Sequence, residues 1–501
     1  MVSYASLIAL VVAGVLFALF SFAIYLFTPP QNFPKNIPTV PFYLTLLPLI
    51  KDVDQADLYR KYLKEPLQKY GAVKIFFGGR WNILLQKPSY VAEVFKYEDI
   101  YAKSGNQVKL PQSIVAEYTG DNIISSHGEN WRLFTSVIKP ALQHEQDPIF
   151  ICRNSKVLKT MLLEEASKAP SGFVVYGLLQ RYALANLSET LFGLSFETLQ
   201  RPDASLHSLQ MRIKPTIFNP IFLNFPFLDH YKWKSRQLGR ELVRKFRNTL
   251  RTDVAKGHNH VCDHESAKLG CRMLGAHRMG LLSEKQLQDN LVSVFLAGHE
   301  NPQLALISLL YLLGEHPAVQ EEVRKEINIV FNNNEGKESE ASYIAIHGLP
   351  ILTSVIYETL RLYPPISQLL NRRTSVPNTL GNNIFIPAGV YVGYNCYATN
   401  RDTSFWGPDA DDFKPSRWGS TLENIKELYR KAKAKGAFIS FHGGRRACLG
   451  QRFAMQELRV TMVEILRGMR WTVDERWDGR MTPAGPLYPR NLRIKFQELK
   501  T

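Results

Sequence analysis

One cysteine stands in a glycine-rich loop with basic residues beside it, in the stretch Phe441-His442-Gly443-Gly444-Arg445-Arg446-Ala447-Cys448-Leu449-Gly450. Glycines let the backbone turn sharply and bring amide N–H groups toward the sulfur. An amphipathic helical pattern over roughly residues 451 to 467 follows the loop, and a helix N-terminus carries partial positive charge. Both features favour the charged form of a thiol, so the loop suits a thiolate that binds iron. The alternative is a buried structural cysteine in a turn, which is the commoner role of a lone cysteine.

The loop fits the pattern F-x-x-G-x-R-x-C-x-G at Phe441, Gly444, Arg446, Cys448 and Gly450. This pattern resembles the haem-binding loop of the cytochrome P450 family. The resemblance implies haem b as cofactor and Cys448 as its proximal iron ligand. It also implies that Arg446 pairs with a haem propionate and that Phe441 packs near the sulfur. Thiolate ligation to haem iron favours cleavage of the O–O bond.

A helix predicted from Pro350 contains the motif E-x-x-R, formed by Glu358 and Arg361. Residues three apart on a helix share a face, and such a pair is usually only a surface ion pair. The downstream stretch 413–418, Phe-Lys-Pro-Ser-Arg-Trp, supplies Arg417. By resemblance to the family, the three side chains form a buried triad that fixes the haem loop, and Arg372 contacts a propionate.

The stretch Ala297-Gly298-His299-Glu300-Asn301 lies in a long apolar helix predicted over about residues 284 to 313. It resembles the oxygen groove of the family, in which Ala297 and Gly298 leave room for dioxygen and Glu300 is the acid of the proton relay. Asn301 departs from the family, which usually has threonine here, although its amide can hydrogen-bond. The structural alternative is a glycine/proline kink in a core helix.

A helix predicted over residues 128 to 140 carries Trp131, at a position where the family has a tryptophan that bonds haem propionates. The basic partner that the family usually has four residues later is replaced by Thr135, and Arg132 is the nearest substitute. A tryptophan in such a helix is otherwise a core residue.

The first 34 residues contain no charged side chain, and residues 7–27 are almost wholly apolar. About 20 apolar residues span a bilayer. The bulky residues and prolines that follow are unlike a signal-peptide cleavage site, so we expect an uncleaved anchor. The first positive charge, Lys35, follows the apolar run, which places the body on the cytoplasmic side of a single-pass protein of the endoplasmic reticulum. The apolar segment 217–228 is expected either to dip into the membrane, as in the family, or to be ordinary core.

Three regions are expected: an anchor (1–28), a proline-rich linker (29–41) and a haem-thiolate catalytic domain (42–501). The fold class implied is mainly α with small β-sheets, the helical prism of the P450 family. A hairpin is predicted over 71–86 with its turn at Gly78-Gly79, and further strands near 384–394 and 492–497.

The formal net charge is +16, without any visible nucleic-acid-binding motif. We therefore expect contact with a membrane and with an acidic protein partner, not with nucleic acid. The basic residues of 430–435 would face NADPH–cytochrome P450 reductase, the electron donor implied by the resemblance. Five widely spaced cysteines argue against a disulfide framework. Six histidines and cysteines of 258–277 match no common zinc pattern, so a metal site there is the weaker reading.

The sequence is thus identified as a member of the cytochrome P450 family, a monooxygenase or oxidase of a small-molecule substrate. The groove sequence Ala-Gly-His-Glu-Asn-Pro resembles fungal members that couple tyrosine-derived units, as in dityrosine or xanthocillin-type isocyanide dimers. Hydroxylation of a lipophilic secondary metabolite is the alternative. Glu300 and the basic run argue against a reductase-independent isomerase or peroxygenase, and a haem sensor is less favoured still.

Overall fold

The computed structural model describes residues 4–258, 265–332 and 345–499 of the chain. Most of these residues are helical. The α-helices are α1 (Tyr4–Phe27), α2 (Leu47–Ile50), α3 (Gln55–Leu58), α4 (Lys64–Tyr70), α5 (Pro88–Lys96), α6 (Asn106–Lys109), α7 (Ile114–Thr119), α8 (Gly128–Gln143), α9 (Ile149–Lys168), α10 (Tyr176–Asn186), α11 (Ser205–Ile217), α12 (Pro220–Asn224), α13 (Lys234–Gly257), α14 (Leu269–Arg278), α15 (Glu284–Glu315), α16 (Pro317–Asn332), α18 (Pro350–Leu362), α19 (Cys396–Thr399), α20 (Thr403–Trp406), α21 (Leu422–Ala434) and α22 (Gln451–Gly468). Shorter 3₁₀ or π segments are η1 (Phe42–Thr45), η2 (Tyr59–Leu63), η3 (Leu187–Phe192), η4 (Pro226–His230), η5 (Ile346–Gly348), η6 (Pro415–Trp418) and η7 (Gly444–Arg446).

The strands form small sheets, as the fold class requires. They are β1 (Ala72–Phe76), β2 (Trp81–Leu85), β3 (Tyr101–Lys103), β4 (Phe173–Val174), β5 (Gln368–Thr374), β6 (Asn378–Leu380), β7 (Ile384–Ile386), β8 (Tyr391–Asn395), β9 (Met469–Val473) and β10 (Arg493–Glu498). The sheet orders are β1-β2-β8-β5-β3, β4-β10-β9 and β6-β7. The predicted hairpin is confirmed as the antiparallel pair β1–β2, and the strand signals near 384–394 and 492–497 correspond to β7, β8 and β10.

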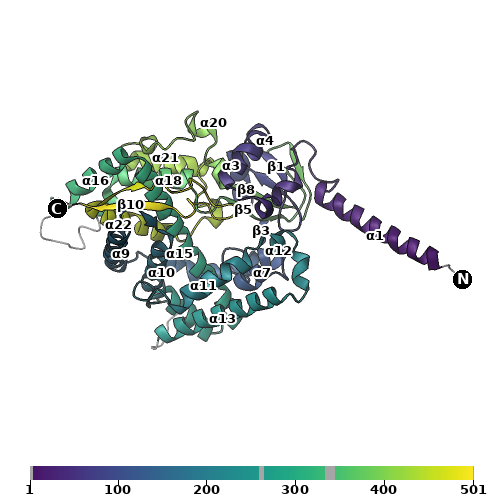
Figure 1. The fold of residues 1–501 in the computed structure, drawn as a ribbon, viewed down its shortest axis with the longest axis horizontal. Coiled ribbons are helices and arrows are strands. Elements are labelled where there is room, and N and C mark those ends of the chain that lie inside the picture. Colours follow the sequence, from purple (N-terminus) through teal and green to yellow (C-terminus); the bar gives the residue numbers. More distant parts are fainter. Residues whose placement is uncertain (1–3, 259–264, 333–344, 500–501) are drawn as a thin grey trace.

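The five-stranded sheet lies at the end of the body nearest α1 (Figure 1). Within it β3 and β5 are antiparallel, and Lys103 is the direct cross-strand partner of Arg372. A register irregularity lies in β5 between Leu369 and Arg372, where β5 pairs with β8. A bulge of this kind redirects the side chains that follow it. The sheet therefore places two basic side chains next to each other on neighbouring strands.

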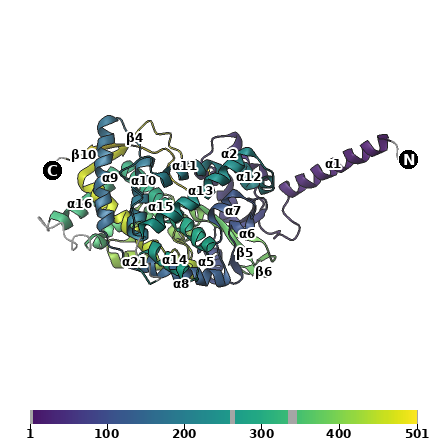
Figure 2. The same ribbon diagram turned by 90° about the horizontal axis from the view of Figure 1, so that it is seen from below.

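Helix α1 projects from the body in both views (Figures 1 and 2). Its segment Ser6–Phe27 has a mean hydropathy of 2.8 and is not buried, so it is long and apolar enough to cross a membrane. At the body end of α1, the indole of Trp81 donates to the Tyr25 carbonyl at 3.0 Å. The rings of Phe22 and Phe227 meet edge to face at 6.3 Å.

The segment 217–228 is not core: it folds into α12 and η4, beside the end of α1, and most of its residues are exposed or half-buried. Phe218, Ile221 and Phe227 are 54%, 42% and 46% exposed. Two prolines start the two short helices and prevent one longer helix from forming. Of the two readings, the surface position is therefore the one that the fold adopts.

Helix α15 passes through the middle of the body (Figure 2). Its start is fixed by a capping box, in which Ser283 and Gln286 satisfy each other's backbone N–H groups. Its central residues are almost all buried in the largest hydrophobic cluster. The helix packs against α10, α13, α18 and α22. The predicted helix is thus confirmed, two residues longer at its C-terminus.

The other helices predicted around the motifs are also present. Helix α8 runs through Pro140, where we expected it to stop, because this proline removes only one intrahelical hydrogen bond near the helix end. Helix α18 begins with Pro350, and α22 begins three residues after Cys448.

The histidines and cysteines of 258–277 do not assemble into a metal site among the described residues. His258 bonds the Phe192 carbonyl at 2.7 Å, and His277 bonds the Leu282 carbonyl at 2.8 Å. Cys271 is buried in α14. The remaining three, His260, Cys262 and His264, lie outside the described residues.

Candidate active site

The cysteine loop is folded tightly against the segment that ends α5. The Cys448 N–H donates to the Phe441 carbonyl at 2.9 Å, which closes the loop. Gly444 has a positive φ of 61°, and a Cβ at this position would lie 2.3 Å from the Phe95 carbonyl oxygen. Only glycine fits such a position. The fold therefore requires at least one glycine of the loop, and Gly450 caps the start of α22.

Opposing effects act on the pKa of the Cys448 thiol. Burial raises this pKa and has the largest effect, while the Gly450 N–H and the Lys433 ammonium lower it, in the direction that the sequence predicted for loop amides and basic residues. Binding of the sulfur to a metal cation would favour its deprotonated form further.

The three residues of the predicted triad are together. The Glu358 carboxylate, fully buried, accepts two hydrogen bonds from Arg361 at 2.8 Å each and one from Arg417 at 3.3 Å. It also accepts from the Lys414 N–H and the Trp418 indole, both at 3.0 Å. This carboxylate thus ties α18 to the chain around η6.

Arg372 and Arg446, expected at the cofactor, lie on either side of one carboxylate that the sequence did not single out. Glu98 accepts from Arg372 at 2.5 Å and from Arg446 at 2.9 Å. Arg446 also donates to backbone carbonyls of Ile123 and Ser126. All of these arginine and glutamate side chains are nearly inaccessible to solvent.

Trp131 joins this group, because the Arg446 guanidinium lies 4.7 Å from the centre of its ring. Arg132 does not join it. It is exposed on α8 and forms no hydrogen bond or ion pair within the described residues. Neighbouring residues on a helix point about 100° apart, which explains why only one of the two faces the group. The hydroxyl of Thr135 is buried without a hydrogen-bond partner.

On α15, the Asn301 amide N–H donates to the Ala297 carbonyl at 3.1 Å. Gly298 points elsewhere: a Cβ on it would lie 2.5 Å from a methyl carbon of Leu187 in η3. Its small size is therefore required for packing between helices, whether or not it also leaves room for dioxygen. Pro302 follows Asn301 and has no N–H for the Gly298 carbonyl.

Two side chains of α11 fix the position of the Glu300 carboxylate. Its carboxylate lies 2.8 Å from the Lys214 ammonium and accepts from the Gln210 amide at 2.9 Å, both from α11. Lys214 also donates to the Tyr176 hydroxyl at 3.2 Å. Despite burial, Glu300 and Tyr176 raise the pKa of Lys214, which therefore stays charged. The expected relay acid is thus an ion-paired carboxylate.

The profile of the family described as Cytochrome P450 matches residues 34–496. The chain belongs to the cytochrome P450 family. It is 43% identical over 488 residues to Cytochrome P450-DIT2 of Saccharomyces cerevisiae, covering 97% of each chain. It is 37% identical over 492 residues to Cytochrome P450 monooxygenase xanG of Aspergillus fumigatus, covering 96% of this P450 and 90% of that relative. Both relatives are fungal, as the groove sequence predicted.

As a P450 the protein is a monooxygenase with haem bound through a cysteine thiolate, and it receives electrons from NADPH through a reductase. The residues present fit this cofactor. The Nε–H of Arg372 is buried without an acceptor, beside two further basic side chains. An anionic group such as a propionate would satisfy it. When bound, haem supplies the activation of dioxygen.

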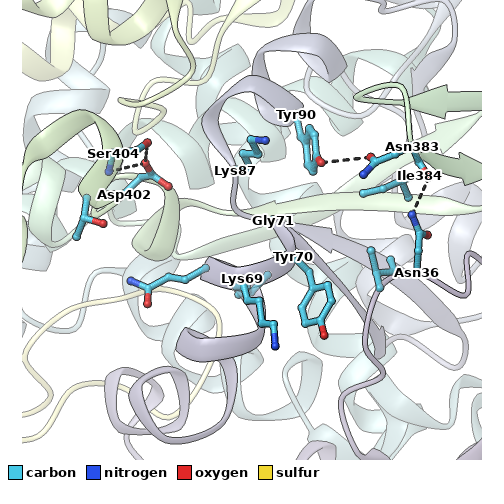
Figure 3. Close-up of a pocket in the computed structure, with 14 residues that line it drawn as sticks. Asn36, Lys69, Tyr70, Gly71, Lys87, Tyr90, Asn383, Ile384, Asp402 and Ser404 are labelled. Carbon is cyan, nitrogen blue, oxygen red and sulfur yellow. Dashed lines mark hydrogen bonds between the residues drawn. The ribbon is translucent and has the colours of Figure 1, made fainter.

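A surface cavity of about 430 Å³ is lined by residues from the linker, the end of α4, the start of α5, the β6–β7 turn and the turn at Asp402. Figure 3 shows its polar lining, in which the Tyr90 hydroxyl donates to the Asn383 side chain. None of the predicted site residues lines it. This cavity therefore belongs to the outer surface and not to the haem site.

Several residues of the site escaped the sequence analysis. Glu98 and Lys103 lie outside every family motif that we recognised, and Lys214 lies in an unremarkable helix. Glu98 contacts Arg372 and Arg446, which lie 274 and 348 residues further along the chain. Lys214 contacts Glu300, which is also distant in the sequence. Ser104 and Gly105 follow Lys103 directly, so no local pattern of the sequence marks this lysine as a site residue.

Proposed function

We propose that this P450 couples two tyrosine-derived phenols, such as isocyanide or N-formyl tyrosine units, in fungal secondary metabolism. In such a coupling one bond forms between two rings and the two substrates together lose two hydrogens. One dioxygen and one NADPH are consumed per dimer and two waters leave, so no oxygen enters the product. The likeness to two fungal P450s supports this proposal.

The observation that carries the proposal is the state of Asn301. Its N–H is bonded to the Ala297 carbonyl, and an amide does not exchange protons as readily as a hydroxyl does. Glu300 beside it is paired with Lys214. Proton delivery is therefore less direct than with threonine at position 301. Coupling of phenols inserts no oxygen and is compatible with asparagine at this position, while the activation of dioxygen needs protons in coupling and in hydroxylation alike.

The test uses the full chain with a reductase in microsomes and N-formyl-tyrosine as substrate. A product with the mass of two substrates less two hydrogens, and without label from heavy-isotope dioxygen, supports coupling. A labelled monomer would favour the alternative, hydroxylation of a lipophilic metabolite, for which the retained Glu300 is the favouring observation.

Asn301→Thr examines the relay separately. Threonine restores a hydroxyl that can both donate and accept, so we expect oxygen insertion to rise relative to coupling and the leakage of hydrogen peroxide to change. An unchanged product ratio together with unchanged peroxide would remove Asn301 from the argument. Ser308→Thr, a buried change later in α15, is the matched control.

For the site residues, we propose that Cys448 is the proximal ligand, with Phe441 and Gly450 shaping its loop. Arg372, Arg446 and Trp131 hold the propionates, and Ala297 lies at the groove. The reduced, CO-bound enzyme should show the Soret band typical of thiolate ligation, and Cys448→Ser should abolish it. Cys396→Ser, at a buried cysteine outside the loop, should retain the band.

For the topology, we propose the regions 1–28 as anchor, 29–41 as linker and 42–501 as catalytic domain, with the body on the cytoplasmic face of the endoplasmic reticulum. The exposed apolar α1 and the neighbouring Phe227 support this placement. Arg430 and Lys431 on α21, and Lys435 directly after it, are exposed and are proposed to meet the acidic reductase. Protease added to sealed microsomes should digest the body; protection of the body would reverse the orientation.

A further inference from the structure

The side chain of Glu98 is a buried link between two arginines that come from distant parts of the chain. It lies between α5 and β3 and is 4% exposed. One of its carboxylate oxygens accepts from Arg372 and the other from Arg446. Since each oxygen takes one guanidinium, the carboxylate fixes the position of each arginine relative to the other.

Arg372, on β5, has a hydrogen-bond donor without an acceptor among the described residues. Arg372 uses Nη1 for both Glu98 and the Tyr101 carbonyl, the latter at 3.1 Å. Its Nε–H is buried and has no acceptor in the part of the chain that the structure describes. A buried donor without an acceptor is costly. Glu98 therefore turns Arg372 so that one edge faces an acceptor that the chain does not provide.

A third basic side chain adds to the positive charge. Lys103 stands directly opposite Arg372 across the β3–β5 pair, an arrangement that is unfavourable for like charges. Lys103 is 7% exposed, and its ammonium has no hydrogen-bond acceptor within the described residues. Burial, Arg372 and Arg446 lower the pKa of Lys103 well below its ordinary value, so this ammonium needs an anion beside it to stay charged. His442 lies nearby and stays neutral, because desolvation together with Lys103 and Arg372 lowers its pKa to about 3.

The propionates of a bound haem would keep Lys103 protonated against the effect of burial. With Lys103, Arg372 and Arg446 protonated, three positive charges face the single negative charge of Glu98, which leaves two. Haem b carries two propionates, so the excess matches the cofactor in sign and number. Electrostatic complementarity of this kind requires the cations to be fixed before the ligand arrives.

We propose that Glu98 is a positioning residue for the haem: it holds Arg372 and Arg446 ready for the propionates and, with Lys103, sets the electrostatic potential at that edge of the cofactor. Uptake of one electron from the reductase adds negative charge to the haem. Glu98 therefore disfavours reduction and Lys103 favours it. The proposal uses only the haem of the family and is independent of the substrate.

The test compares reduction potentials of the full-length, haem-loaded enzyme by spectroelectrochemistry. Glu98→Gln should shift the potential to more positive values, and Glu98→Asp should return it toward the wild-type value. Glu98→Gln should also release haem to apomyoglobin several-fold faster, because the two arginines then repel each other. Asp99→Asn removes a negative charge from the exposed neighbouring residue and should change neither quantity.

Lys103→Gln removes a positive charge and tests for a shift of the reduction potential in the opposite direction. It should shift the potential to more negative values, which a general loosening of the fold would not do. An unshifted potential in both Glu98→Gln and Lys103→Gln, or shifts of the same sign, would overturn the proposal. If Glu98→Gln does not take up haem, Lys103→Gln decides alone, and an unchanged or more positive potential refutes it.

Discussion

Glu457, on α22, is a fully buried carboxyl group whose ionisation the fold opposes. One of its oxygens accepts from the Asn186 amide at 3.0 Å, and the other has no partner among the described residues. Burial raises the pKa of Glu457 to about 8 from the ordinary value of 4.5. The folded protein therefore keeps this proton at neutral pH, whereas the unfolded chain releases it.

The sign of the pH dependence follows from this difference. Between the unfolded pKa and the folded pKa of Glu457, the native state binds more protons than the unfolded state, so stability falls as pH rises. The loss reaches at most about 1.4 kcal/mol per pH unit, or about 3 kcal/mol between about pH 5.5 and about pH 7.5. Glu457→Gln removes this loss while nearly preserving the shape of the side chain.

We expect the midpoint of thermal unfolding of Glu457→Gln to rise relative to wild type by about 3 °C between these two pH values, at about 1 °C per kcal/mol for a chain of this size. Scanning calorimetry of the haem-loaded enzymes at one scan rate measures the difference. Glu427→Gln, on the exposed face of α21, is the control and should show no such change. A difference between Glu457→Gln and wild type that stays constant with pH would refute the reasoning.

Two further substitutions test buried charges. Glu358→Gln leaves Arg361 and Arg417 without their buried counterion and should destabilise the enzyme by about 3–5 kcal/mol in urea unfolding; a loss below about 1 kcal/mol would contradict a structural triad. Lys109 is 3% exposed, and burial and Arg80 lower its pKa to about 7. Lys109→Met should therefore stabilise the enzyme at pH 7 by roughly 1–3 kcal/mol, and the gain should shrink as pH rises toward 10.5, because the unfolded lysine then loses its proton too. An equal gain at both pH values would point to packing instead.

The local parts of the site could be predicted because a few neighbouring residues define them. The cysteine loop needs Gly444 at a positive φ, and Glu358 and Arg361 are one helical turn apart. Each of these constraints involves only residues within a short stretch of the sequence. The same holds for the hairpin and for the long apolar helices, where the periodicity of the pattern matches the burial.

The parts that were missed depend on tertiary packing. Glu98 reaches Arg372 and Arg446 only because β3 pairs with β5 and the loop lies against α5. The requirement for Gly298 comes from Leu187 in η3, a contact that the motif does not reveal. Arg132 was chosen for its charge, but the helix turns it to solvent. Residue type identified candidate groups, and only the packing showed which of them meet.

The contact between the end of α1 and the β1–β2 hairpin has a consequence for how the enzyme sits in the bilayer. Because the Trp81 indole is bonded to the Tyr25 carbonyl, the sheet is fastened to the anchor before the proline-rich segment begins. That segment then returns the chain to the body and does not act as a free tether. We therefore expect the catalytic body to keep a fixed height and tilt relative to the bilayer, with the apolar side chains around Phe227 held at the lipid surface.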